Sequence, residues 1–326
     1  MEMKTPPRPS YFGLQVTVII AFTTILILTV TIVFSGVIVA ASPESANLVP
    51  TVTSTPTLTP TPTFDPALNA PLPDHRLILF YGIPGAPTVG PAYAPTQQLL
   101  TQMQQYAKLW NAADPSKPVM LGLDLVVDVA DAFPGPNGTY SHLVDSGTIQ
   151  SFIDFCGQNN LLLFLDLQFG RSPVKTIVTQ MEPYLERYPF VSIAIDTEFH
   201  FPPNYGVPDY DLGWVDASDI NWTIQTLHTI VAQYHVPRKV LIVHQWNPAV
   251  ITNKNKIITD PYVSLVLHSD GFGTPQEKLA DYQLFVTQQL IQYGGLKLFF
   301  NLDTVLLTPQ QVLSEYTPAP LVISYQ

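Results

Sequence analysis

The chain has 326 residues, which exceeds one average domain but accommodates a single large α/β barrel of about 250 residues with an additional segment. Its formal net charge of −11, without any cluster of lysine and arginine, excludes a nucleic-acid-binding protein, because phosphates need a basic face. The single cysteine, Cys156, excludes an internal disulfide and a cysteine-based zinc site, and its apolar neighbours indicate a core residue.

The N-terminal part of the sequence predicts a membrane anchor. Residues 12–41 are mostly apolar and uncharged, and this run is longer than the about 20 residues that span a bilayer as a helix. It also exceeds the hydrophobic core of roughly 7–15 residues in a cleaved signal peptide. Cleavage within residues 39–42 and a buried core helix are the alternatives. Positive charges in residues 1–11 are expected to stay in the cytoplasm, which predicts a single-pass protein of the cell membrane with an extracytoplasmic C-terminal domain.

Residues 42–74 predict a linker outside the membrane. Their repeated Thr-Pro pairs oppose helices and sheets, because proline fixes φ and removes a hydrogen-bond donor. We expect an extended, polyproline-like or disordered segment that holds the following domain away from the bilayer.

The remaining residues, 75–326, alternate short apolar runs with longer helix-like stretches. The apolar runs are residues 76–82, 119–130, 161–170, 191–199, 239–246, 264–273, 296–303 and 320–326. Near-continuous apolar strands are typical of a parallel sheet that is covered on both faces.

Six of the intervening segments have helical periodicity or caps. They are residues 96–113, 145–160, 173–188, 216–235, 274–295 and 308–316. The fifth of these ends at the glycine pair Gly294 and Gly295, which suits a helix C-cap. Residues 247–260 show the weakest helical pattern. The whole pattern predicts a (β/α)8 barrel over residues 75–326, with a doubly wound open sheet as the competitor, although no glycine-rich phosphate loop follows the first strand.

Polar and ionisable residues occur at or near the ends of the predicted strands. In a (β/α)8 barrel the active site gathers at the carboxyl ends of the strands. Residues two apart on a strand share a face, so the sequence predicts the pairs Asp196 and Glu198, Asp166 and Gln168, His268 and Asp270, and Asn301 and Asp303. Neighbouring carboxylates raise one another's pKa, which keeps one of them protonated for acid catalysis.

Paired carboxylates in a groove lined by aromatic residues are typical of glycoside hydrolysis. We predict Glu198 as the general acid, Asp196 as the residue that orients it, and Asp270 as base or nucleophile, a role for which Asp303 is a second candidate. The predicted substrate-binding residues are Tyr81, Asp166, Gln168, Arg171, His244, Gln245, Trp246, His268, Asp303 and Tyr325. Further aromatic residues that could stack on sugars are Tyr205, Tyr210 and Trp214.

Two resemblances accompany this interpretation. The D-T-E of residues 196–198 resembles the D-x-E that ends the fourth strand in chitinase-like and muramidase-like glycoside hydrolase barrels. Val191 and Ala194 occupy the positions where the fuller chitinase-like motif has earlier acidic residues. The segments "YGIPG", "LDLQFGRS", "AIDTEF", "VHQW", "HSDGFG", "KLFFNLD" and "SYQ" resemble a group of exported or membrane-anchored bacterial proteins, which implies the architecture but no particular reaction.

The predicted function is therefore that of a glycoside hydrolase-like enzyme acting on a cell-wall or extracellular glycan, without a cofactor or metal ion. One alternative is a non-catalytic surface barrel that binds glycan or protein. The other is a metal-dependent hydrolase, whose ligands would be drawn from Asp166, Glu198, His200, His244, His268 and Asp270. The polar strand ends also have a purely structural interpretation, in which Asp128 and Asp303 cap helices and Arg171 neutralises Asp166 or Glu198.

Overall fold

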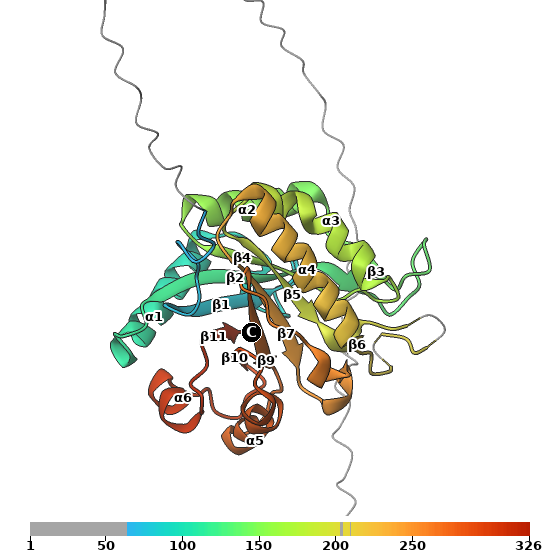
Figure 1. Ribbon diagram of the computed structural model, residues 1–326. Coiled ribbons are helices and arrows are strands. Elements are labelled where there is room, and N and C mark those ends of the chain that lie inside the picture. The colour runs from blue at the N-terminus through green and yellow to red at the C-terminus, as the bar shows by residue number, and fades with distance from the viewer. Residues whose placement is uncertain (1–63, 203–204, 209) are drawn as a thin grey trace, which may run out of the picture. The chain divides into compact units, whose positions relative to one another are not determined.

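The computed structural model describes residues 64–202, 205–208 and 210–326, which we call the barrel unit (Figure 1). The segments predicted for residues 1–11 and 12–41, and the part of the predicted linker before Phe64, lie outside the described residues. Within the described ranges, none of the helices has the length and apolar character needed to cross a bilayer.

A closed barrel of parallel strands is the centre of this unit. Its strands are β1 (Arg76–Gly82), β2 (Val119–Ala130), β4 (Leu162–Leu167), β5 (Val191–Asp196), β7 (Lys239–Gln245), β9 (Val263–Ser269), β10 (Tyr293–Leu298) and β11 (Val322–Tyr325). They pair in that order, and β1 pairs with both β2 and β11, so the ring closes. The predicted (β/α)8 barrel is confirmed, and the open doubly wound sheet is wrong.

Helices surround the barrel (Figure 1). They are α1 (Gln97–Ala113), α2 (Ser146–Gln158), α3 (Val174–Arg187), α4 (Ala217–Tyr234), α5 (Pro275–Phe285) and α6 (Pro309–Glu315). Side-chain caps begin most of them, including the capping boxes of Thr274 with Glu277 and Thr308 with Gln311, because these side chains satisfy amide groups that lack a partner within the helix.

The connection between β7 and β9 differs from the others. The described residues there form two short 3₁₀ helices, η3 (Pro248–Val250) and η4 (Lys254–Lys256), around the two-residue strand β8 (Ile251–Thr252), with no α-helix. β8 pairs in parallel with β6 (Val215–Asp216), which precedes α4. The segment with the weakest helical pattern in the sequence is therefore the one that lacks a helix.

Two element boundaries differ from the predictions for a physical reason. Gly294 and Gly295 lie inside β10 and do not cap α5. Glycine is needed at both positions because a Cβ would overlap Tyr282 at position 294 and His268 at position 295. β5 ends at Asp196 and the chain turns into a 3₁₀ helix, η2 (Thr197–Phe199), where the Thr197 hydroxyl donates to the His244 carbonyl at 2.7 Å.

The apolar core has an inner part inside the barrel and an outer part between the barrel and the helices. Leu72 belongs to the inner part and is 1% exposed, and Phe64 packs on the His235 ring at 4.8 Å. Residues 64–74, which the sequence assigned to the linker, thus pack against the barrel. The residues packed on the barrel therefore extend before residue 75, and Leu72 belongs to the apolar layer inside the barrel.

Candidate active site

One polar ring lies above the inner apolar core. Each barrel strand has an apolar or small residue that faces the inside of the barrel. Because side chains two apart on a strand share a face, the residue two positions later also faces the inside. These eight positions are Tyr81, Asp124, Asp166, Asp196, His244, His268, Lys297 and Ser324, and each is at most 4% exposed. The register joins them directly, since Tyr81 pairs with Asp124, and His244 pairs with both Asp196 and His268.

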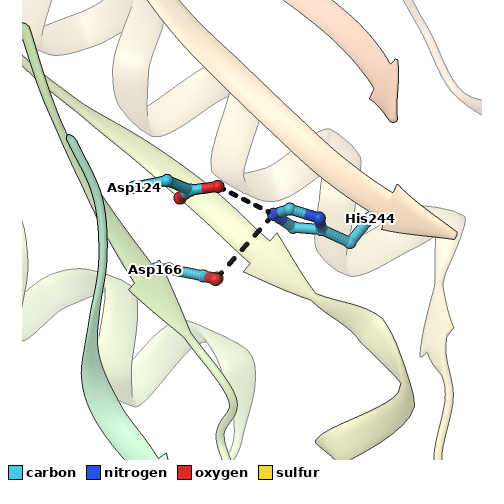
Figure 2. Close-up of side chains that lie close together, drawn as sticks. All are labelled: Asp124, Asp166 and His244. Carbon is cyan, nitrogen blue, oxygen red and sulfur yellow. Dashed lines mark ion pairs between the residues drawn. The ribbon is translucent and has the colours of Figure 1, made fainter. Parts of the chain in front are cut away.

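His244 lies between carboxylates on several strands. Figure 2 shows its Nε2 facing Asp124 from β2 and Asp166 from β4, at 3.5 Å and 3.8 Å from their Oδ2 atoms. Its Nδ1 lies 3.4 Å from Oδ2 of Asp270, which follows β9. Burial disfavours the charged ring, but these three carboxylates outweigh that effect and hold the pKa of His244 well above its ordinary value.

A second group of carboxylates lies at the outer edge of the ring. Oxygen atoms of Asp196, Glu198 and Asp270 lie within 4.8 Å of one another. Glu198 is partly exposed and comes from η2, whereas Asp196 and Asp270 are buried. Burial, and then the charges of Asp196 and Asp270, raise the pKa of Glu198 well above its ordinary value. Glu198 is therefore the member that combines a raised pKa with partial exposure of the residue.

Gln168 fixes the orientation of Asp196. Its Nε2 donates to Oδ2 of Asp196 at 3.1 Å, and its Oε1 accepts from the backbone amide of Ala130 at 2.9 Å. The pKa of Asp166 is raised well above its ordinary value, first by burial and then by the charge of Asp196. The structure thus brings Asp166, Gln168, Asp196, His244 and Asp270 together, as the sequence predicted.

The structure adds two residues to the predicted set. Asp124 and Lys297 face the barrel interior, and the ammonium of Lys297 lies 3.5 Å from the centroid of the Tyr81 ring. Burial, and then the charge of Asp196, raise the pKa of Tyr81. In the sequence, both residues are recognisable as ionisable side chains within otherwise apolar strands. Strand-end reasoning missed Asp124 because β2 continues six residues beyond it to Ala130.

Four predicted binding residues lie elsewhere. Tyr325 faces the helices and accepts from the Trp110 indole at 3.0 Å, and Gln245 faces outward and binds Lys254. Asp303 accepts from Lys278 at 3.1 Å and from backbone amides. Arg171 donates to the Gly206 carbonyl and lies on the Tyr140 ring, so it does not neutralise Asp166 or Glu198.

The reason for the position of Arg171 is a turn after β4. Phe169 and Gly170 have φ values of 66° and 55°, and this left-handed backbone directs the following residue away from the ring. Asp128 supports the same turn, since its Oδ2 accepts from the Phe169 amide at 2.7 Å. Neither Asp128 nor Asp303 is a helix cap.

The remaining candidate residues from the sequence, one inside the polar ring and two outside it, differ in their environments. His268 lies inside the barrel, with Nε2 at 3.1 Å from the Ser324 hydroxyl. Burial, and then the charge of His244, lower its pKa well below the ordinary value, so it is neutral. Trp246 is half-buried directly after β7, and His200 has its Nδ1 at 2.7 Å from the Trp214 carbonyl, away from the carboxylates.

Aromatic side chains lie in the loop that follows Glu198. The amide of Gly213 donates to the Glu198 carbonyl at 2.8 Å, and the amide of Trp214 donates to the His200 carbonyl at 2.8 Å, so the end of this loop returns to η2. The Tyr205 and Trp214 rings are 4.6 Å apart in a T-shaped arrangement, and Tyr205 is 47% exposed. Tyr210, which is 82% exposed, belongs to the same loop.

A separate cavity of about 440 Å³ lies between the loop after β1, β3 (Ser141–Leu143) and the start of α2. Its lining includes Tyr93, His142 and Phe152, and none of the ring carboxylates.

No family model and no curated protein sequence matches the chain. Among solved structures, the chain is similar to a GH18 chitinase from Pseudoalteromonas aurantia, with 11% sequence identity, a TM-score of 0.39, and coverage of 76% of this chain and 93% of that chain. It is also similar to a GH5-4 broad-specificity endoglucanase from an uncultured bacterium, with 9% identity, a TM-score of 0.31, and coverage of 67% and 76%.

Proposed function

We propose that this protein is a glycoside hydrolase-like enzyme that cleaves a cell-wall or extracellular glycan with carboxylate acid and base catalysis. The observation that carries the proposal is the group of Asp196, Glu198 and Asp270, whose oxygen atoms lie within 4.8 Å of one another at the carboxyl ends of the barrel strands. One member of this group, Glu198, has a raised pKa and is partly exposed.

In this mechanism Glu198 donates its proton to the glycosidic oxygen as the bond breaks. Asp196, held by Gln168, maintains the high pKa of Glu198 through its charge. Asp270 attacks the anomeric carbon, and water then hydrolyses the glycosyl-enzyme intermediate with Glu198 acting as base. This is the retaining route, in which the two carboxyl groups stand roughly 5–5.5 Å apart, whereas inverting pairs stand roughly 6.5–9.5 Å apart to admit a water molecule.

The aromatic pair of Tyr205 and Trp214 supports a sugar substrate. Its two residues belong to the loop that follows Glu198, and the exposed Tyr205 offers an apolar face on which a pyranose ring can stack. Trp246 and Tyr81 flank the same strand ends, and Tyr81 is buried beneath them.

The test is Glu198→Gln, which keeps the size of the side chain but removes the transferable proton. We expect a loss of about 10²- to 10⁴-fold in kcat on the glycan that the protein cleaves, found by a screen of cell-wall polysaccharides for release of reducing ends. Circular dichroism and thermal unfolding should match those of the unaltered chain.

The matched control is Glu315→Gln, the same substitution at an exposed position at the end of α6. This variant should retain full activity. Full activity of Glu198→Gln on the same glycan would contradict the assignment of Glu198 as the acid.

We also propose that residues 12–41 anchor the enzyme in the cell membrane as a single-pass helix, with residues 42–63 as an extracytoplasmic linker. The support is the length of the uncharged run and the positive charges that precede it. Protease added to intact cells stripped of their wall should digest the barrel domain, and deletion of residues 1–41 should leave the domain inside the cell. Protection of the full-length chain would contradict this location.

A further inference from the structure

The side chains of Asp124, Asp166 and His244, which we call the inner cluster, are fully buried and lack hydrogen bonds. Both carboxylate oxygens of each aspartate and both ring nitrogens of the histidine are without a hydrogen-bond partner among the described residues. Burying charged groups in this way costs free energy unless another charge compensates them. A protonated His244 ring is one source of that charge, and a metal ion at the centre of the inner cluster is the other.

The distances in the inner cluster suit a shared cation better than direct hydrogen bonds. The histidine Nε2 lies 3.5 Å and 3.8 Å from the two carboxylate oxygens, whereas a hydrogen bond between such atoms is about 2.7–3.2 Å long. Ligand atoms at about 2.0–2.2 Å from a tetrahedral zinc ion stand roughly 3.3–3.6 Å apart, which is close to the observed separations. Figure 2 shows the three side chains converging on one point from three strands.

The surroundings of His244 are those of a metal ligand. Its second nitrogen, Nδ1, faces Oδ2 of Asp270 at 3.4 Å. A histidine that binds a metal through one nitrogen commonly donates the proton on the other nitrogen to a carboxylate, which fixes the tautomer and the ring orientation. Asp270 thus occupies the place of the supporting carboxylate.

We propose that Asp124, Asp166 and His244 bind one zinc ion inside the mouth of the barrel. One imidazole nitrogen and two carboxylate oxygens are a suitable donor set for zinc, and three protein ligands leave a fourth position open. The ion would compensate the two buried carboxylates in place of a protonated His244 ring, whereas the ammonium of Lys297 lies on Tyr81. Asp270 also belongs to the proposed catalytic group, but zinc binding can be measured whether or not the protein cleaves a glycan.

The sequence offered a metal site only as an alternative, because its histidines show no close spacing with other ligands. The inner cluster takes one residue from each of β2, β4 and β7, and these strands come together only when the barrel closes. The competing state is a charged His244 ring that forms ion pairs with the two aspartates and excludes a metal.

The test measures metal binding by the full-length chain, purified in detergent without a histidine tag. We expect elemental analysis to find about one zinc per chain, and calorimetric titration of the chelator-treated protein with zinc chloride to give the same stoichiometry. Cobalt added to the chelator-treated protein should give the visible absorption of a tetrahedral site with a nitrogen ligand. A folded, unaltered chain that binds no zinc would overturn the proposal and leave the ion-paired state.

Two variants locate the ion. Asp166→Asn, which keeps the side-chain shape, should weaken zinc binding at least 100-fold, and Asp270→Asn should weaken it about 10- to 100-fold. The control is Asp131→Asn at the exposed pair of Asp131 and His142, which lie 2.8 Å apart and could hold zinc on the surface. Unchanged zinc affinity in Asp166→Asn, or its loss in Asp131→Asn, would overturn the assignment to the inner cluster.

Discussion

Individual carboxyl groups in this barrel differ in what surrounds their charge. Asp303 is buried against the ammonium of Lys278, so its charge has a partner. Glu198 is surrounded by other carboxylates, which favour its protonated form. Asp128 is buried with one backbone amide as donor, and burial raises its pKa to about 6. The role proposed for Glu198 and the stability effect of Asp128 thus have the same origin, which is the cost of a desolvated charge.

The raised pKa of Asp128 predicts a pH-dependent contribution to stability. Because the pKa in the folded state lies above the value of about 3.9 in the unfolded chain, folding is favoured below about pH 4, and that advantage is lost as the pH rises through 6. Asp128→Asn can still accept the Phe169 amide and carries no charge. Between about pH 4 and pH 7, the free energy of unfolding of the variant should therefore improve relative to the unaltered chain by up to about 3 kcal/mol.

Urea denaturation across this pH range measures the difference. Asp154→Asn, at an exposed position of α2, is the control and should show no comparable change, because its carboxyl group lies at the surface. A constant difference between Asp128→Asn and the unaltered chain across the range would mean that Asp128 ionises in the fold without cost.

At the scale of elements, β10 shows how packing overrides local pattern. Gly294 and Gly295 follow a helix, which is typical of a C-cap, but they are strand residues. Gly295 faces the interior, where an added Cβ would overlap the His268 ring and lie 3.0 Å from Val266. The glycine is needed so that β10 can approach the histidine on β9.

Gly295→Ala should therefore destabilise the fold by about 1–3 kcal/mol through overpacking, and it should displace His268 from Ser324. Gly157→Ala in α2 is the matched control, because its Cβ would make ordinary contact with Phe190 at 3.4 Å and alanine favours a helix. Thermal unfolding of both variants tests the difference. Equal melting temperatures for Gly295→Ala and the unaltered chain would show that the His268 ring moves without cost.

At the scale of the whole molecule, the segment before the first strand completes the barrel. Leu72 is 1% exposed and contacts the inner apolar core, whereas Leu68 in the same segment is 67% exposed. The apolar core inside the barrel thus includes a residue that lies outside the repeating strand and helix pattern.

Leu72→Ala should lower the free energy of unfolding by about 2–5 kcal/mol, because it removes apolar contacts and leaves a cavity inside the barrel. Leu68→Ala, the same substitution at an exposed position, should change it by less than about 0.5 kcal/mol. Urea denaturation compares the two. Similar small effects at both positions would indicate that residues 64–74 contribute nothing to the closed barrel.

The sequence by itself determined the class of fold and the end of the barrel where polar groups gather. Strands buried on both faces must be apolar along their length, so eight such runs separated by helical segments were sufficient to predict the barrel. The polar residues that follow strands, among them Asp196 and Glu198, predicted the carboxyl-terminal face because parallel strands all end on the same side.

Only the tertiary structure decided which polar residues meet. Whether a strand residue faces the interior depends on the register with its neighbours, and a shift of one residue reverses it. Tyr325 and Gln245 therefore point outward, whereas Asp124 and Lys297 point inward from positions within apolar runs. His244 could not be placed between the two aspartates from sequence, because that contact depends on three strands that are joined only through closure of the barrel.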